Sequence, residues 1–307
     1  MSGKPLVIVL DAPTMEGRRF TASTPLPDYW ALTKPEINFL IAIATFAGFY
    51  LGRPSGPHEF PFLPLIHTLL GTLLVASGTG TLNQYIERRF DAQMHRTARR
   101  PLAAARMEPS SALWFGITLL LAGAGYLAAT TNFLASLLAV ATLASYLFVY
   151  TPLKRITPLS TLVGAIPGAV PPLIGSAAAS GRLASAAWVL YLILFLWQFP
   201  HFMAIAWMYR EDYDRAGYLV LPRGQSRDRF VTLQTILPLL FLVPAALLPT
   251  VFCDSGLLYL LGACLLSVSF LYCGMQFVLH RSGATARRLL VASIFYLPLL
   301  LALMMVT

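Results

Sequence analysis

Nine separate stretches of this chain are apolar and long enough to cross a lipid bilayer as helices. A hydrocarbon core of about 30 Å needs roughly 20 helical residues. The stretches cover residues 35–52, 62–82, 112–130, 133–150, 161–179, 186–208, 232–252, 255–279 and 288–306. Backbone polar groups in lipid must find partners within the protein, and a helix pairs them within its own segment. We therefore expect an all-α polytopic membrane protein with nine transmembrane helices.

Composition supports this class and excludes others. Of the 307 residues, 57% are hydrophobic and only 11% are charged, whereas about a quarter of a soluble domain is charged. The net charge of +9 does not predict a nucleic-acid partner, because the basic residues are divided among short loops between the apolar stretches. Cys253, Cys264 and Cys273 lie in or beside apolar segments without CxxC spacing, so no disulfide framework is expected.

The distribution of positive charge predicts the orientation. All but Arg53 and Arg182 of the 22 Lys and Arg residues fall in segments that share one side of the membrane. The positive-inside rule places that side in the cytoplasm, with the N-terminus there and the C-terminus in the periplasm. We see no removable secretory signal or convincing transit peptide and expect a bacterial inner membrane. Residues 1–30 are predicted to form a cytoplasmic segment, and 31–307 the membrane domain.

A polar stripe follows the second apolar stretch. Asn83, Glu87 and Asp91 are four residues apart, a spacing that places them on one face of a helix. Their oxygen atoms are suitable ligands for a hard cation such as magnesium. Six arginines lie between Arg88 and Arg106, and guanidinium groups bind phosphate well. The pattern predicts a site for a magnesium-bound diphosphate at the mouth of a membrane helix.

Two more segments on the same side carry candidate groups. Glu211, Asp212 and Asp214 form a second acidic cluster, and metal ions between the two clusters would stabilise a diphosphate leaving group. Lys154 could neutralise a phosphate, and Tyr150 could face a developing carbocation. The alternative for this pair is an interfacial aromatic residue and a topology-determining charge.

His201 lies well inside the sixth apolar stretch. Ionisable groups in a membrane are costly and usually face a cavity or a partner. Its neutral imidazole could bind iron or relay a proton. A hydrogen-bonded structural histidine is an equally good interpretation.

These motifs together resemble the UbiA superfamily of intramembrane prenyltransferases, and within it the branch that farnesylates haem. The resemblance runs from about Asp28 to the end of the chain. It is carried by Asp28–Pro35, Asn83–Leu102, Tyr150–Arg155, Gly168–Pro172, Trp197–Phe202 and Arg210–Gly217. Met94–Thr97 and Pro200–Phe202 point to haem as the acceptor. Glu87 departs from the pattern, because many bacterial members have Asp there.

The resemblance implies a UbiA-type helical bundle and a specific reaction. Farnesyl diphosphate alkylates a vinyl group of haem b, and water addition gives haem O and diphosphate. Haem b is then a substrate, and Mg²⁺ is the cofactor. The lipid bilayer surrounds the protein, and haem A synthase or terminal oxidase assembly is a further expected partner.

The resemblance also assigns roles to individual residues. The expected catalytic residues are Asn83, Glu87, Asp91, Tyr150, Lys154 and Asp212. Four of these are expected to bind magnesium: Asn83, Glu87, Asp91 and Asp212. The expected substrate-binding residues are Arg96, Arg100, His201, Arg210 and Asp214.

Three other functions fit parts of the sequence. A prenyltransferase for an aromatic acceptor would share the acidic clusters and differ in the acceptor pocket. A transporter or channel would also use nine spans with buried proline, but acidic clusters confined to one face argue against a path through the membrane. A haem-binding assembly factor without catalysis is the third.

Overall fold

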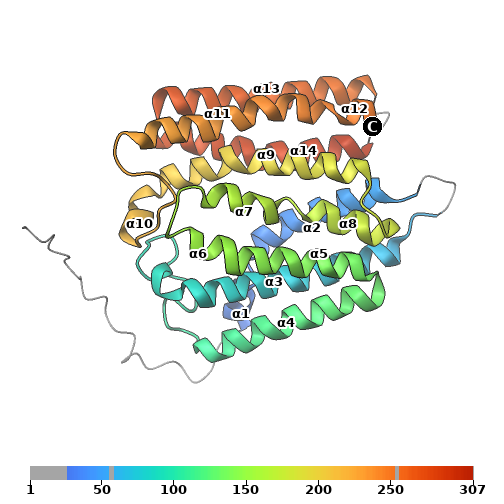
Figure 1. The fold of residues 1–307 in the computed structure, drawn as a ribbon, viewed down its shortest axis with the longest axis horizontal. Coiled ribbons are helices and arrows are strands. Elements are labelled where there is room, and N and C mark those ends of the chain that lie inside the picture. Colours follow the sequence, from blue (N-terminus) through green and yellow to red (C-terminus); the bar gives the residue numbers. More distant parts are fainter. Residues whose placement is uncertain (1–25, 55–58, 253–255, 307) are drawn as a thin grey trace, which may run out of the picture.

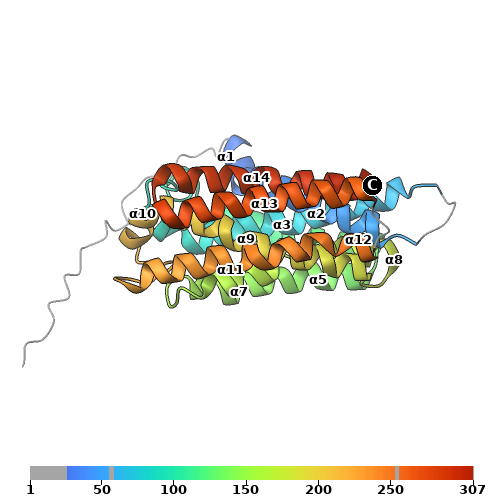
Figure 2. The same ribbon diagram turned by 90° about the horizontal axis from the view of Figure 1, so that it is seen from above.

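The computed structural model describes residues 26–54, 59–252 and 256–306. Over these ranges the chain is helical and has no strand. Nine of its helical stretches are long and apolar enough to cross a membrane. They lie side by side with their long axes aligned, as the two perpendicular views show (Figures 1 and 2). The prediction of an all-α, nine-span membrane protein is confirmed.

The first half of the bundle contains five spans. A short helix, α1 (Leu26–Leu32), precedes them. The spans are formed by α2 (Pro35–Gly52), α3 (Phe62–Asp91), α4 (Pro109–Thr130), the run α5 (Phe133–Ala144), η1 (Ser145–Tyr150) and α6 (Thr151–Leu153), and the pair α7 (Ser160–Gly168) and α8 (Pro171–Ser180). The η1 segment is a π-helical turn within the fourth span.

The second half contains four spans and two short helices. They are α9 (Ser185–Met208), α10 (Arg210–Arg215), α11 (Ser226–Leu247), α12 (Pro249–Phe252), α13 (Leu257–His280) and α14 (Gly283–Val306). The largest difference from the predicted spans is in α3, which continues past residue 82 to Asp91. Apolar length predicts only the part in lipid, whereas Gln, Glu and Arg after it are good helix formers.

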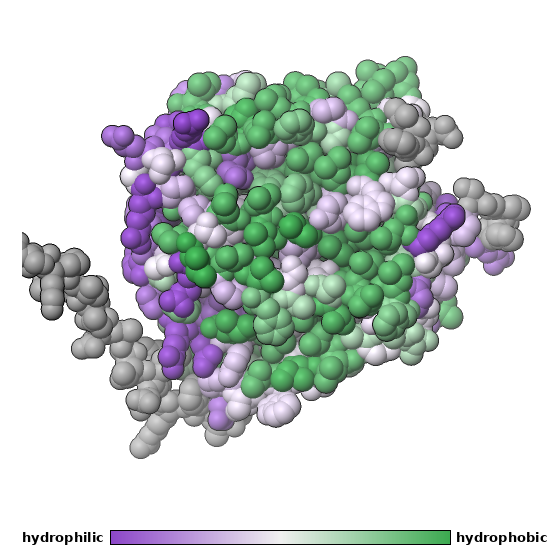
Figure 3. Space-filling view, viewed as in Figure 1, coloured by the Kyte–Doolittle hydropathy of each residue, from purple (hydrophilic) through white to green (hydrophobic). Residues whose placement is uncertain are grey.

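Two buried apolar clusters hold the bundle together, and further apolar side chains cover its outer surface. One cluster joins α9, α11, α13 and α14 with α2, and the other joins α3, α4, α5 and α8. Many large apolar side chains are exposed, among them Phe148, Leu265 and Leu279. On the face shown in Figure 3, hydrophobic residues cover the middle and hydrophilic residues gather at one end. An exposed apolar surface of this extent belongs in lipid, so the chain is a multi-pass membrane protein.

Helices α2 and α8 approach each other backbone to backbone. A Cβ atom added at Gly48 would lie 2.1 Å from Pro172 O, and one at Gly175 would lie 2.1 Å from Thr45 O. Small residues allow such close packing between helices in membranes. This contact holds α2 in place against α8. Lys34 directly precedes the first residue of α2.

Candidate functional site

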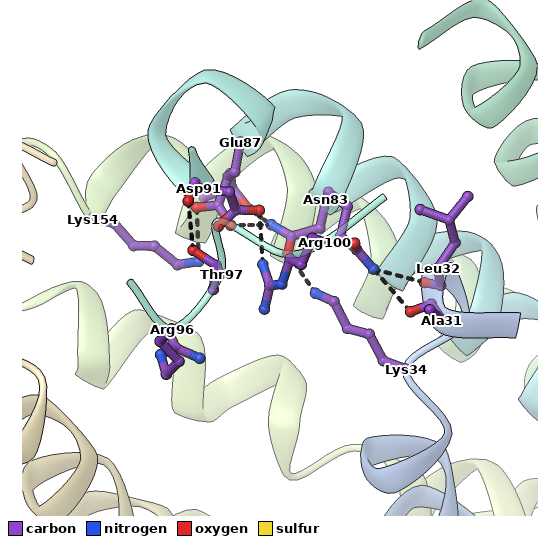
Figure 4. Close-up of polar contacts among 12 residues, drawn as sticks. Ala31, Leu32, Lys34, Asn83, Glu87, Asp91, Arg96, Thr97, Arg100 and Lys154 are labelled. Carbon is purple, nitrogen blue, oxygen red and sulfur yellow. Dashed lines mark hydrogen bonds and ion pairs between the residues drawn. The ribbon is translucent and has the colours of Figure 1, made fainter. Parts of the chain in front are cut away.

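The polar stripe predicted from the sequence lies on one face of α3 (Figure 4). Asn83, Glu87 and Asp91 are only 1%, 6% and 2% exposed. Asn83 Nδ2 donates to Glu87 Oε2 at 2.9 Å. Buried carboxylates are stable only with charged or hydrogen-bonding partners, so the stripe requires cations nearby.

Two lysines from different elements supply such partners. Lys34 Nζ donates to Asn83 Oδ1 at 2.7 Å, and Lys154 Nζ lies 2.9 Å from Glu87 Oε1. Burial, with a contribution from Arg100, lowers the pKa of Lys34 to about 7. Burial would also lower the pKa of Lys154, but the Glu87 carboxylate outweighs it and raises that pKa well above its usual range.

The loop after α3 folds back over the end of the stripe. Arg100 NH1 lies 2.8 Å from Asp91 Oδ2, and Thr97 Oγ1 donates to the backbone oxygen of Asp91 at 2.9 Å. Arg106 is anchored to Asp28 of α1, with its NH2 group 2.7 Å from Asp28 Oδ1. We refer to Lys34, Asn83, Glu87, Asp91, Arg100 and Lys154 as the α3 clamp.

The second acidic cluster contributes one buried carboxylate. Asp212 is 7% exposed; its Oδ2 accepts the backbone N–H of Arg96 at 3.1 Å, and its Oδ1 lies 2.9 Å from Arg215 NH1. Burial would raise the pKa of Asp212, but these donors outweigh it and lower the pKa. Asp212 therefore joins α10 to the loop that covers the clamp.

The other two acids of that cluster point elsewhere. Asp214 pairs with Arg227 at 3.3 Å on the surface, and the Glu211 side chain is 81% exposed. Spacing alone did not distinguish these three acids. A helix turns by about 100° per residue, so neighbours on α10 face different surroundings.

Tyr218 joins the second loop directly to the clamp, a contact that the sequence did not reveal. Its hydroxyl donates to Glu87 Oε1 at 3.0 Å, and Leu219 N donates to Lys154 O at 2.7 Å. Lys34 was also missed as a site residue. Its position directly before the first span and Pro35 was the available signal, whereas Tyr218 offered none.

Tyr150 lies beside the clamp. Lys154 Nζ is 4.6 Å from the centre of its ring. The ring packs against Gly164, where an added Cβ would come within 2.5 Å of it. Of the predicted substrate-binding residues, Arg100 is in the clamp, and the Arg96 guanidinium lies over the rings of Tyr209 and Tyr213 at 5.2 and 5.8 Å.

His201 and Arg210 are not brought into the clamp. His201 Nδ1 lies 2.8 Å from Ser293 Oγ, and its ring stacks on Trp197 with 4.8 Å between ring centres. Arg210 NH1 donates to Trp207 O at 2.9 Å. Over the described ranges, neither residue has a hydrogen bond or ion pair with a clamp residue.

The donor set of the clamp fits magnesium held together with a diphosphate. In the part of the chain that the structure describes, no three His, Cys, Asp or Glu side chains gather closely enough to hold a metal ion alone. Magnesium, however, is usually bound by one or two carboxylates together with substrate phosphates. Arg100 and Lys154 balance the two carboxylates, and Lys34 adds a positive charge when it is protonated, which favours an anionic ligand.

The fold and this site define a class: a polytopic helical membrane protein with a cationic, oxygen-rich clamp at one end. The chain belongs to the UbiA prenyltransferase family, whose family model matches residues 41–300. The expected membership in a family of prenyl-transferring enzymes is thus confirmed.

Individual relatives agree with this assignment. A protein of Solibacter usitatus named protoheme IX farnesyltransferase is 49% identical over 284 residues, covering 91% of this chain and 97% of that protein. A solved digeranylgeranylglyceryl phosphate synthase has a TM-score of 0.72 at 18% identity, covering 92% of this chain and 97% of that one. A UbiA homologue of Archaeoglobus fulgidus bound to GPP and Mg²⁺ has a TM-score of 0.59 at 16% identity, covering 90% and 99%. The two structures show the shared fold.

Proposed function

We propose that this protein transfers the farnesyl group of farnesyl diphosphate to a vinyl group of haem b, and that water addition then gives haem O and diphosphate. The observation that carries the proposal is the α3 clamp, where three cations surround a stripe of buried oxygen donors. The relative named protoheme IX farnesyltransferase supports the choice of substrates. The Archaeoglobus homologue bound to GPP and Mg²⁺ supports a metal-assisted diphosphate site.

The cations of the clamp bind the diphosphate in this proposal. Lys34, Arg100 and Lys154 contact diphosphate oxygens in place of the stripe, and Asn83, Glu87, Asp91 and Asp212 are the residues that would hold Mg²⁺. The metal supplies charge stabilisation to the leaving diphosphate. The loop of residues 92–108 covers the clamp and limits the access of water.

The aromatic and remaining polar residues act on the organic parts of the substrates. Tyr150 presents its ring next to Lys154, where it stabilises positive charge on the allylic carbon after ionisation. Arg96 binds the diphosphate from the junction with α10. His201, Arg210 and Asp214 are proposed to contact the substrates from outside the clamp.

The proposed setting follows the charge distribution. The clamp end faces the cytoplasm of a bacterium, the membrane is the inner membrane, and the C-terminus lies in the periplasm. The division into residues 1–30 and 31–307 stays a prediction, since residues 1–25 lie outside the described ranges. A partnership with haem A synthase or terminal oxidase assembly likewise stays a prediction.

Mass spectrometry of the haem product tests the function. Purified protein with Mg²⁺, haem b and farnesyl diphosphate should form a haem species heavier by a farnesyl group and water. Asp91→Asn, which breaks the pair with Arg100, should abolish turnover, whereas Glu211→Gln removes an exposed charge and should retain it. No reaction with haem, together with prenylation of 4-hydroxybenzoate, would overturn the choice of acceptor.

A further inference from the structure

A second and larger cavity, which opens widely to its surroundings, lies outside the α3 clamp, between the end of α9, the start of α10 and the start of α14. Its volume is about 820 Å³, compared with about 200 Å³ for the cavity beside Glu87. The walls combine three arginines with apolar side chains: Arg210, Arg287, Arg288, Met208, Val291 and Ala292. Cavities of this size bind small molecules. The mixed lining fits an amphiphile with an anionic end.

The arginines of this cavity are poorly neutralised. Within the described ranges, Arg287 and Arg288 form no hydrogen bond or ion pair. Arg210 reaches one carboxylate, the exposed Glu211 at 3.4 Å. By contrast, the nearby Arg281 pairs with Asp228. The positive-inside rule accounts for arginines at this end of the bundle, but it does not require three of them around one cavity. Guanidinium groups in this arrangement are suited to carboxylates, which they bind through paired hydrogen bonds.

The two helices that form the long walls of the cavity, α9 and α14, carry His201 and its partner Ser293 beyond the end of the cavity. Met208 follows His201 by seven residues on α9, so the two share a helix face and are about 10 Å apart along the axis. On α14, the cavity residue Ala292 directly precedes Ser293, which contacts His201. A ligand that extends from the arginines into the membrane along these helices therefore approaches His201.

The hydrogen bonds of Ser293 favour one tautomer of His201. Ser293 Oγ donates its single hydrogen to Leu290 O, at 2.6 Å, and so it can only accept from His201 Nδ1. A neutral imidazole protonated at Nδ1 carries its lone pair on Nε2. None of the described residues bonds to Nε2. An electron-pair donor thus lies about two helical turns below the arginines.

We propose that this cavity binds the two propionate carboxylates of the haem acceptor through Arg287 and Arg288, with Arg210 assisting. The inference rests on the proposed function and adds two residues to it. Met208, Val291 and Ala292 contact the apolar ring, which extends along α9 and α14 toward His201. The carboxylates stay at the polar end, because charged groups are costly in lipid. Arg210 and Asp212 project from opposite sides of α10, so the acceptor and the diphosphate occupy two sides of one short helix.

Haem binding, measured without turnover, tests the proposal. The variant is Arg287→Gln with Arg288→Gln in phosphatidylcholine nanodiscs, titrated by Soret absorbance with haem b and with its dimethyl ester, in which both carboxylates are methylated. The variant should bind haem b at least about tenfold more weakly than the unaltered protein. The dimethyl ester should bind both proteins equally weakly. The KM for farnesyl diphosphate should not change.

A matched control removes the same charge elsewhere. Arg223→Gln with Arg229→Gln alters two exposed arginines at the same end of the bundle that do not line the cavity, and haem affinity should be retained. Equal thermal midpoints show that both double variants fold.

Three results would overturn the inference. The first is that the Arg287/Arg288 variant binds haem as tightly as the control variant does, while haem O is still formed. This result would leave the proposed function intact. The second is an equal loss of affinity for haem b and for its dimethyl ester. The third is an effect that appears only with phosphatidylglycerol, which assigns the arginines to lipid headgroups. Absence of haem binding by the unaltered protein, with prenylation of another acceptor, would instead reject the proposed function as well.

Discussion

Replacing Lys154 by methionine should destabilise the protein through a carboxylate that loses its cation. The ion pair with Glu87 is buried, with side chains 14% and 8% exposed. Removing one partner of a buried pair costs about 3–5 kcal/mol, because the other charge is left without compensation. Tyr218 and Asn83 still bond to Glu87 and offset part of this cost. We therefore expect a loss near the lower end, about 3 kcal/mol.

A double-mutant cycle separates the pair from the rest of the site. Unfolding of Lys154→Met, Glu87→Gln and the double variant can be followed in detergent by titration with sodium dodecyl sulfate. The double variant should be more stable than Lys154→Met alone, because no unpaired charge remains, with a coupling of about 1–3 kcal/mol. All three variants should lose turnover, since both residues belong to the proposed diphosphate site.

The pH dependence of this effect follows from the raised pKa of Lys154. A lysine whose pKa is higher in the folded state contributes stability that is fully present below its unfolded pKa and is lost only as the pH rises through the folded one. The difference between the unaltered protein and Lys154→Met should therefore not decrease as the pH rises from about 7 to about 9. A stability change of less than about 0.5 kcal/mol, or a double variant no more stable than the single one, would refute the reasoning.

Three further predictions concern the same site. Burial lowers the pKa of Lys34 to about 7, and a bound anion would raise that pKa. Binding of a non-hydrolysable farnesyl diphosphate analogue near pH 8 should therefore take up protons. Calorimetry in two buffers with different ionisation enthalpies measures this proton uptake, and equal binding heats in the two buffers would contradict the prediction. Gly164→Ala should displace the Tyr150 ring, lower turnover and cost about 1–3 kcal/mol, whereas Gly125→Ala meets no atom within 4 Å and should lower neither turnover nor stability. Chelation of magnesium by EDTA should stop turnover without lowering the thermal midpoint, because the stripe already has cation partners; a lower midpoint would argue for a structural metal.

The membrane architecture could be predicted because it depends on local quantities. Apolar length determines a span, and the first predicted span coincides with α2 (Pro35–Gly52). The same reasoning ended the second span at residue 82, where polar residues begin. The helix itself continues to Asp91, since leaving lipid does not oblige a helix to end. Apolar length therefore predicted the spans but not the end of α3.

The site could be predicted only where its residues share one element. Asn83, Glu87 and Asp91 follow a helical period that is visible in the sequence. Lys34 reaches Asn83 from 49 positions away, and Tyr218 reaches Glu87 from 131. Contacts over such separations arise from tertiary packing. A single sequence carries no periodic signal for them.

The π-helical turn η1 has a consequence for how such a site can be altered by mutation. A π-helical turn holds one residue more than an α-helical turn and is typical of functional segments. Tyr150 ends η1, and Lys154 follows four residues later. Deleting a single residue from this turn would restore a regular α-helix, and both side chains would keep their direction relative to α5, because the wider turn absorbs the extra residue. A one-codon deletion within η1 would thus keep this side of the clamp in place, whereas the same deletion within the regular helix α5 would turn it by about 100°.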